Sequence, residues 1–350
     1  MNPMRGAVIG GGTIAKLSHL PALASLKGVE IDYVVDTNLK RAKSIARKFK
    51  VKNAESDYKA ILEKNLDFVC ITTPPFYHKE IAVDFLKAGI PVLIEKPIAT
   101  KESDAKEILT TAARKSVICG VVHNRRFYST IQRAKKTIGD GRLGDIYHAD
   151  FNSFVTGPSI GYPATDWHFN PEVSGGGVSM DQGIHTLDLI RWILGEITSI
   201  YSIDTTIFKS TNNTDTSSLS IVTCATTRVS MELSWISDYT ACPITLRGSA
   251  GVIYIEPMLG YYEEVHEPRN PAKRWLNFTR TVTRFAASFG FNNLENTHKM
   301  LIGNFLLCLK EGRTPLVTGQ DGYLALRDVA TMYESMRENK EIKSVSSDEN

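Results

Sequence analysis

The first 140 residues alternate between short, continuous apolar runs and amphipathic segments. A short apolar run bounded by polar turns is typical of a strand that is buried on both faces of a sheet. Strands of this kind joined by helices predict a parallel sheet with right-handed crossovers, which is a doubly wound α/β (Rossmann) domain. We expect its strands at 6–10, 31–35, 68–72, 92–95 and 117–122, and helices near 14–27, 39–49, 57–64, 78–88, 102–115 and 128–138.

The pattern changes after Gly144. Residues 146–156 alternate as a half-buried strand does, and an amphipathic helix follows Gly175–Gly177. Later segments rich in β-branched residues predict an open, mostly antiparallel sheet. We therefore predict a Rossmann domain over 1–123 and an α+β domain over 124–350. Further strands are expected near 197–209, 216–224, 228–237, 242–248 and 251–256, an irregular block at 258–292, and helices at 295–311 and 320–338, the last packing back on the first domain.

Composition narrows the class of protein. A chain of 350 residues with 42% hydrophobic and 23% charged residues can bury two globular cores. Its net charge of +3 gives no indication of a nucleic-acid or membrane partner. No apolar stretch approaches about 18 residues, and the N-terminus lacks a signal-peptide pattern. The cysteines are scattered and lack metal-site spacing, so we expect reduced thiols in a cytoplasmic protein: Cys70, Cys119, Cys224, Cys242 and Cys308.

A glycine-rich turn follows the first predicted strand and opens the first predicted helix. Gly10 permits the tight turn, Gly12 lets backbone amides approach a pyrophosphate, and Ala15 is small enough for helix–strand packing. Thr13 and Ile14 begin the helix, whose positive end favours phosphate charge. The strand–turn–helix context favours a dinucleotide site over an unrelated glycine loop.

Asp36 ends the second predicted strand, where a carboxylate can accept hydrogen bonds from both ribose hydroxyls of the adenosine. The same charge would repel a 2′-phosphate, which favours NAD over NADP, although Lys40 and Arg41 follow closely. The alternative is that Asp36 caps the next helix. Thr72, Thr73 and Pro74 end the fourth run and are expected at the same sheet edge, where open α/β sheets bind ligands.

Two further motifs end a central strand and open a later helix. They are Glu95-Lys96-Pro97 and the glycine run that precedes Asp181, His185 and Asp188. Together with the glycine-rich turn, they resemble the Gfo/Idh/MocA family (glucose–fructose oxidoreductase, inositol dehydrogenase and relatives). The resemblance covers nearly the whole chain and extends to His19, His78, Asn124–Phe127 and Asp321–Tyr323.

The resemblance implies an oxidoreductase that moves a hydride between NAD and a secondary hydroxyl or ketone of a sugar, inositol or sugar derivative. Lys96, Asp181 and His185 match the family's catalytic group, with His185 as the acid/base. The residue types agree with these roles: an ammonium can polarise the reacting oxygen, and an imidazole can take the hydroxyl proton. Asp181 lies four residues before His185 and shares its helix face. The resemblance also assigns His78, Glu95 and Lys96 to the cofactor side.

Basic and aromatic side chains near the motifs are the candidates for the substrate pocket. They join the catalytic group there: Arg126, Tyr162, Trp167 and His168 with Lys96, Asp181 and His185. A metal site of Asp181, His185 and Asp188 is the alternative, but no second histidine accompanies His185, so no metal is expected. In 258–292, aromatic and basic residues predict a covering or interface loop, and arginines that bind an anionic substrate group are the alternative.

The resemblance also implies a homodimer or homotetramer. The alternating Leu219, Ile221 and Thr223 would suit the sheet face that the family uses as an interface. The expected partner is a small polyol or sugar, and no nucleic acid or membrane. Two other activities stay open: an NAD-using glycoside hydrolase, which produces no net NADH, and a non-catalytic regulator that senses NAD or a sugar. The presence of all three catalytic residue types favours the dehydrogenase.

Overall fold

The computed structural model describes residues 2–157, 166–206, 214–266 and 295–344. Close contacts divide the chain into two compact units. The division does not follow one boundary near residue 123, because two later segments join the N-terminal part. Unit 1 comprises Met1–Asn124, Thr165–Gly175 and Asn296–Arg327, and unit 2 comprises Arg125–Ala164, Gly176–Glu295 and Asp328–Asn350.

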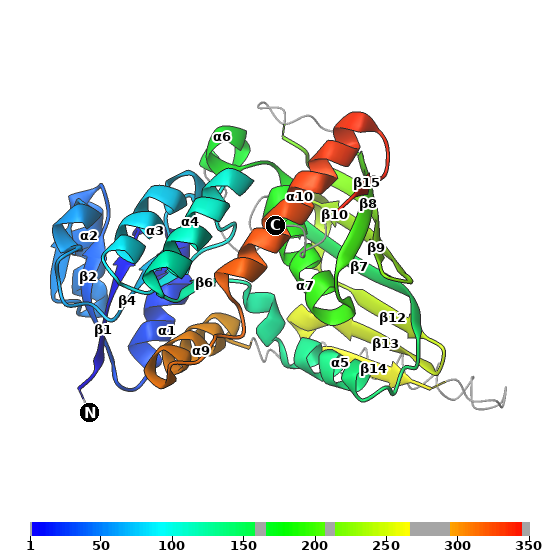
Figure 1. Cartoon of the computed structure of the whole chain (residues 1–350), viewed down its shortest axis with the longest axis horizontal. Helices are drawn as coiled ribbons and strands as arrows, with labels where there is room; N and C mark the ends of the chain where they lie inside the picture. Colours follow the sequence, from blue (N-terminus) through cyan, green and yellow to red (C-terminus); the bar gives the residue numbers. More distant parts are fainter. Residues whose placement is uncertain (1, 158–165, 207–213, 267–294, 345–350) are drawn as a thin grey trace. The chain divides into compact units, whose positions relative to one another are not determined.

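Unit 1 is built on a six-stranded parallel sheet with the order β3-β2-β1-β4-β5-β6. Successive strands are added on one side of β1 up to β3 and on its other side from β4 on. Right-handed crossovers therefore put α1 and α2 on one face and α3 and α4 on the other, where α3 and α4 lie side by side (Figure 1). Both faces are covered, and the neighbouring strands β4 and β5 are therefore wholly apolar and buried. The strands are β1 (Met4–Ile9), β2 (Val29–Val35), β3 (Asn53–Glu55), β4 (Phe68–Ile71), β5 (Val92–Ile94) and β6 (Cys119–Val121). The helices are η1 (Ala15–His19), α1 (Leu20–Ser25), α2 (Leu39–Phe49), η2 (Tyr58–Ile61), η3 (Pro75–Tyr77), α3 (His78–Lys87), α4 (Glu102–Lys115), η5 (Asp166–Phe169) and α6 (Pro171–Ser174).

Two helices from the end of the chain explain why late residues belong to unit 1. Phe305 of α9 (Thr297–Glu311) is buried against Gly120 of β6, where a Cβ would lie 3.0 Å from the ring. A Cβ on Gly322 of α10 (Gly319–Glu338) would lie 2.6 Å from the Val121 side chain. Glycine at both positions lets these helices approach the edge strand, and residues of α10 beyond Arg327 belong to unit 2.

Unit 2 is built on a nine-stranded sheet with the order β14-β13-β12-β7-β10-β9-β8-β15, to which β11 adds by pairing with β7. Among the described residues, its strands pair antiparallel except β10 with β7, which pair in parallel. Its helices α5 and α7 contact this sheet (Figure 1). The strands are β7 (Ile146–Thr156), β8 (Ile197–Asp204), β9 (Ser217–Cys224), β10 (Thr227–Ser234), β11 (Ile236–Ala241), β12 (Ile244–Gly248), β13 (Gly251–Glu256), β14 (Tyr261–Val265) and β15 (Ile342–Lys343). The helices are α5 (Ser129–Gly139), η6 (Ser179–Gly183), α7 (Ile184–Leu194) and η7 (Pro257–Leu259), while η4 (Asn124–Phe127) begins at the boundary between the units.

The predicted fold class is confirmed, and the differences lie in short elements. The segment 57–64 forms only the 3-10 turn η2, and β3 was not predicted because its three residues are mostly polar. The expected irregular block contains β14, an edge strand in which two glutamates hide the alternation. From residue 267 on, that block lies outside the described residues.

Candidate active site

The glycine-rich turn lies where β1 ends and the first helix begins. Gly10 has a φ of +101°, and a Cβ there would lie 2.8 Å from the backbone of Thr72 and Thr73. By contrast, a Cβ on Gly12 would meet nothing within 4 Å. The turn therefore leaves space at Gly12 where a phosphate can approach backbone amides, at a helix that begins at Thr13. These residues fit a dinucleotide.

Asp36 contacts both the glycine-rich turn and the next helix, α2, but it does not cap that helix. Its carboxylate accepts the Gly11 N–H at 2.8 Å and the Asn38 N–H at 2.8 Å. The cap of α2 is Asn38, whose side chain accepts the Arg41 N–H, so the capping alternative for Asp36 is wrong. The Arg41 guanidinium also donates to both carboxylate oxygens, at 2.8 and 2.7 Å. Burial alone would raise the pKa of Asp36, but these hydrogen bonds and the Arg41 charge lower it.

His78 connects two loops at the C-terminal edge of the sheet. Its side chain is fully buried, and its ring nitrogens lie 2.8 Å from the Pro97 and Thr73 carbonyl oxygens. Thr72 is also buried and donates through Oγ1 to the Gly10 carbonyl at 2.7 Å. The resemblance assigned His78 to cofactor contact, but both ring nitrogens are occupied by the backbone. His78 therefore acts as a brace that holds the loop after β4 to the loop after β5.

Glu95 and Lys96 follow β5 beside this brace. Glu95 is buried and accepts a hydrogen bond from His19 Nε2 at 2.6 Å, while His298 Nε2 lies 4.0 Å from the same oxygen. Burial alone would raise the pKa of Glu95, but the His19 hydrogen bond and the charges of His19, His298 and Lys96 lower it to about 2. Lys96 is half-buried. His298 could not be predicted from a local motif, since this residue reaches Glu95 from the distant helix α9.

His19, Glu95 and His298 could in principle hold a metal ion, because one ligand atom of each lies within 4.8 Å of the others. The His19–Glu95 separation of 2.6 Å is that of a charge-assisted hydrogen bond. Two tetrahedral ligands about 2.1 Å from zinc would lie roughly 3.3 Å apart. A hydrogen bond between His19 and Glu95 therefore fits this cluster better than a metal ion bound by both residues.

Asp181 and His185 lie on one continuous helix of unit 2, formed by η6 and α7. The segment Ser179–Gly183 is π-helical, a distortion that is frequent at functional sites. Asp181 is half-buried and accepts hydrogen bonds from Gln182 Nε2 at 2.7 Å and Trp235 Nε1 at 3.2 Å. Arg125 in turn donates to the Gln182 side chain. Sequence reasoning missed Gln182, which is the next residue along the helix, and Trp235, which lies 54 residues later and reaches Asp181 only in the folded chain.

The expected substrate residues fall into three groups. Arg126 is 2% exposed and forms a two-pronged ion pair with Asp188 at 2.9 and 2.6 Å, so its guanidinium is committed inside unit 2 and does not face a substrate. Trp167 and His168 belong to unit 1, where their half-buried rings stack with centroids 3.7 Å apart. Tyr162 lies outside the described residues.

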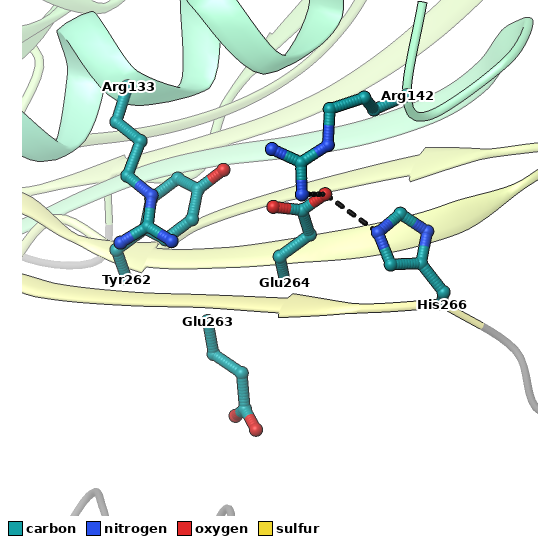
Figure 2. Close-up of a pocket in the computed structure, with 6 residues that line it drawn as sticks. All are labelled: Arg133, Arg142, Tyr262, Glu263, Glu264 and His266. Carbon is teal, nitrogen blue, oxygen red and sulfur yellow. Dashed lines mark hydrogen bonds and ion pairs between the residues drawn. The ribbon is translucent and has the colours of Figure 1, made fainter.

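A surface pocket of unit 2 is separate from these residues. It lies between α5, the turn after it and β14, with a volume of about 490 Å³ (Figure 2). In it, the Arg133 guanidinium stacks 4.0 Å from the centre of the Tyr262 ring, and Glu264 pairs with Arg142 and His266. None of the predicted site residues lines this pocket, which is lined by Arg133, Arg142, Tyr262, Glu263, Glu264 and His266.

Comparison with known proteins identifies the chain's relatives. Residues 4–123 match the profile of an oxidoreductase family with an NAD-binding Rossmann fold, and residues 131–254 match the Gfo/Idh/MocA C-terminal domain. The chain belongs to the Gfo/Idh/MocA family. The predicted NAD-binding domain and oxidoreductase class are thereby confirmed. Within the described residues, no helix is both long and apolar enough to cross a membrane.

The relatives of this Gfo/Idh/MocA protein include named sugar dehydrogenases. D-glucoside 3-dehydrogenase of Escherichia coli is 30% identical over 195 residues, which is 55% of each chain. D-apiose dehydrogenase of Paraburkholderia graminis is 25% identical over 97% of this chain and 90% of its own. The match therefore spans about half the length of the first relative and most of the second.

Solved structures share the fold. A levoglucosan dehydrogenase in complex with NADH and levoglucosan has a TM-score of 0.84 and 19% identity, covering 99% of this chain and 100% of its own. The WlbA dehydrogenase from Bordetella pertussis, in complex with NADH and UDP-GlcNAcA, has a TM-score of 0.84 and 24% identity over 99% of each chain. At these identities the likeness establishes the architecture alone.

Proposed function

We propose that this protein is an NAD-dependent dehydrogenase that transfers a hydride between NAD and a secondary hydroxyl or ketone of a sugar or sugar derivative. The observation that carries the proposal is the position of Lys96. Lys96 lies two residues after the end of β5, beside the His78 brace that links its loop to Thr73. The Thr73 backbone packs against Gly10 of the NAD-binding turn. A cation at this edge can bind an oxygen of a substrate that faces the cofactor.

Each proposed catalytic residue has a distinct task. The bound NAD supplies a hydride acceptor. The Lys96 ammonium binds the substrate oxygen and stabilises the negative charge that develops on it. The His185 imidazole takes the hydroxyl proton during oxidation and returns it during reduction. Asp181, fixed by Gln182 and Trp235, orients a neighbouring substrate hydroxyl by accepting its hydrogen bond.

The relatives support a carbohydrate substrate. Those cited act, by their names, on a D-glucoside, D-apiose or levoglucosan, which share several adjacent hydroxyl groups. An ammonium, an imidazole and a carboxylate suit such a ligand, because Lys96 and His185 can act on the reacting hydroxyl while Asp181 binds a neighbouring one. The carbon that is oxidised and the physiological direction follow from pocket residues that the sequence motifs do not specify.

A substrate panel tests the proposal. The purified protein is first examined for bound cofactor and titrated with NAD, NADH, NADP and NADPH in a thermal-shift assay. It is then incubated with NAD and with glucosides, pentoses, anhydrosugars, inositols and nucleotide sugars, and NADH formation is followed by absorbance. We expect NAD(H) to raise the melting temperature and at least one sugar to produce NADH. Glycoside cleavage without net NADH would instead support the hydrolase, and binding of NAD without any turnover would support the regulator.

We also propose that the protein is a cytoplasmic homo-oligomer. On β9, Leu219 and Ile221 point away from the core and are 42% and 51% exposed, whereas Thr223 is buried. Two neighbouring aliphatic side chains on an open sheet face favour contact with a second copy. Light scattering after size exclusion measures the mass directly, and a monomer at micromolar concentration would contradict the proposal.

A further inference from the structure

Asp215 lies beside the start of the helix that carries Asp181 and His185. Asp215 precedes β9 and is 8% exposed. The helix begins at Val178, after the glycine run. The first backbone N–H groups of a helix have no partner within the helix, so a helix that begins in the protein interior needs acceptors from elsewhere.

Asp215 supplies those acceptors to three successive residues. Its carboxylate accepts the Gly177 N–H at 3.0 Å through Oδ1 and the Ser179 N–H at 2.8 Å through Oδ2. Its backbone carbonyl accepts the Val178 N–H at 2.9 Å. A negative charge at this end of the helix is also favoured by the helix dipole. One residue, 38 positions away from Gly177, therefore fixes the whole first turn.

Tyr333 of α10 fixes the carboxylate in turn. Its hydroxyl donates to Asp215 Oδ1 at 2.8 Å and accepts the Gly177 N–H at 3.0 Å. Burial and the Asp215 charge raise the pKa of Tyr333 well above its ordinary value, so the hydroxyl keeps its proton and remains a donor. All of these residues belong to unit 2.

The arrangement explains two of the three consecutive glycines. A Cβ on Gly177 would lie 2.0 Å from the Asp215 carbonyl oxygen, and a Cβ on Gly176 would lie 2.1 Å from the Tyr333 hydroxyl oxygen. Gly176 also has a φ of +156°. The glycine run is thus shaped to let Asp215 and Tyr333 reach the backbone of the helix start.

We propose that Asp215, supported by Tyr333, is a positioning residue that sets the orientation of the helix bearing Asp181 and His185. The π-helical turn Ser179–Gly183 lies between this anchor and His185. A shift of the first turn is therefore passed along a distorted helix to both side chains. Misplacement of a reacting group by about 1 Å can cost about a hundredfold in rate. The effect on catalysis rests on the proposed function, whereas the effect on the helix does not.

Hydrogen exchange of the full-length protein tests the anchor without any substrate. Asp215→Asn keeps the shape but replaces one accepting oxygen with a donor that faces an N–H group. We expect exchange in peptides covering 176–188 to be at least about tenfold faster, with peptides from α4 and β9 unchanged. Tyr333→Phe, which leaves the Asp215 carboxylate in place, should give a smaller change in the same peptides. The matched control is Asp150→Asn, which alters a carboxylate of the same unit that pairs with Arg247 on β12.

Kinetics with the substrate found by the panel tests the consequence. We expect Asp215→Asn to lower kcat at least about 20-fold and to leave the Kd for NADH within about twofold, because the acid/base is misplaced and the NAD-binding domain is intact. Asp150→Asn should keep kcat. Faster exchange throughout the protein with unchanged kcat would show that Asp215 is only structural and overturn the proposal. If His185→Ala itself retains turnover, the proposed catalytic roles fail, and the exchange result still decides whether Asp215 anchors the helix. Should Asp215→Asn not fold, Tyr333→Phe provides both measurements, and exchange unchanged at 176–188 in that variant would contradict the anchor.

Discussion

His185 is the side chain on which the proposed proton transfer depends. It is 7% exposed and lies one helical turn after Asp181. Replacing it with alanine removes the proton acceptor, so we expect kcat to fall at least about a hundredfold. The affinity for NADH, measured by fluorescence titration, should change less than about twofold. His266→Gln, which removes an exposed imidazole of the same unit, is the control. Turnover of His185→Ala within about tenfold of the parent would make the acid/base assignment wrong.

We expect Asp36 and Arg41 together to govern the choice between NAD and NADP. In this structure the two side chains form a fork-shaped ion pair that also contacts the glycine turn through Gly11. The carboxylate repels a 2′-phosphate, while a released guanidinium would attract one. Asp36→Ser should therefore weaken NAD binding and raise the NADP-to-NAD affinity ratio at least about tenfold.

The double variant Asp36→Ser/Arg41→Ala separates the two effects. Removing the guanidinium should cancel the gain in NADP affinity while the loss in NAD affinity persists, since that loss comes from the carboxylate. Both affinities are obtained by calorimetric titration. An unchanged NADP-to-NAD affinity ratio in Asp36→Ser would show that Asp36 only shapes the glycine-rich turn.

The loops after β4 and β5 form one structure because His78 joins them. A buried ring that contacts the Thr73 and Pro97 carbonyls holds the glycine-facing loop and the Lys96 loop in one arrangement. His78→Ala would leave a buried carbonyl oxygen without its donor and open a cavity, a destabilisation of about 2–4 kcal/mol. We expect both a higher KM for NAD and a lower kcat, together with a lower melting temperature. A variant that lost stability but kept both kinetic constants would show that the brace does not position the cofactor side.

The central strands could be predicted from sequence because each is a continuous apolar run whose type is set locally. The edge elements β3, β14 and β15 could not, since short strands with polar residues are defined by their neighbours in the sheet. The parallel pairing of β10 with β7 is likewise a property of the assembled sheet. Local pattern therefore determines which segments become strands, and packing determines how the short ones pair.

In the candidate site, too, some residues could be predicted from local sequence and others could not. Lys96, Asp181 and His185 lie in local motifs and were found from them. The residues that hold them come from distant segments, as His298, Trp235 and Asp215 show. Arg126 was misassigned for the same reason: its motif does not reveal that Asp188, 62 residues later, takes its guanidinium. Local motifs thus identify the proposed reacting groups, whereas the groups that orient them can be identified only in the folded structure.

The proposed cofactor residues and the proposed acid/base residue fall in different compact units of the molecule. The glycine turn, Asp36 and Lys96 belong to unit 1, and Asp181, His185 and their anchors belong to unit 2. NAD binding and proton transfer can therefore be impaired separately by substitution. A variant of unit 2 that lost NAD affinity as strongly as turnover would be inconsistent with this separation.

The stability of the whole chain should fall as the pH drops below neutrality. Burial lowers the pKa of His298 to about 4, although Glu95 opposes the shift, and burial also lowers the pKa of His78. The groups that face His298 are Glu95, His19 and Lys96. The unfolded chain binds a proton on His298 below about pH 6.5, whereas the folded chain binds it only near the lowered pKa of about 4. The free energy of unfolding therefore decreases as the pH falls from about 6.5 to about 4. For His298 alone the loss is at most about 3 kcal/mol.

Glu95 extends the loss to lower pH. Its pKa is about 2 in the folded protein, so the stability that it contributes is present above about pH 4.5 and lost as the pH falls toward 2. Calorimetry at pH 7.5, 6.5, 5.5 and about 4.5 isolates the histidine window. His298→Gln should reduce the decline in melting temperature across that window without abolishing it, because His78 remains. His266→Gln, which removes an exposed ring of unit 2 outside this cluster, is the control and should leave the decline unchanged. An identical decline in His298→Gln and the parent would place the acid sensitivity outside this cluster.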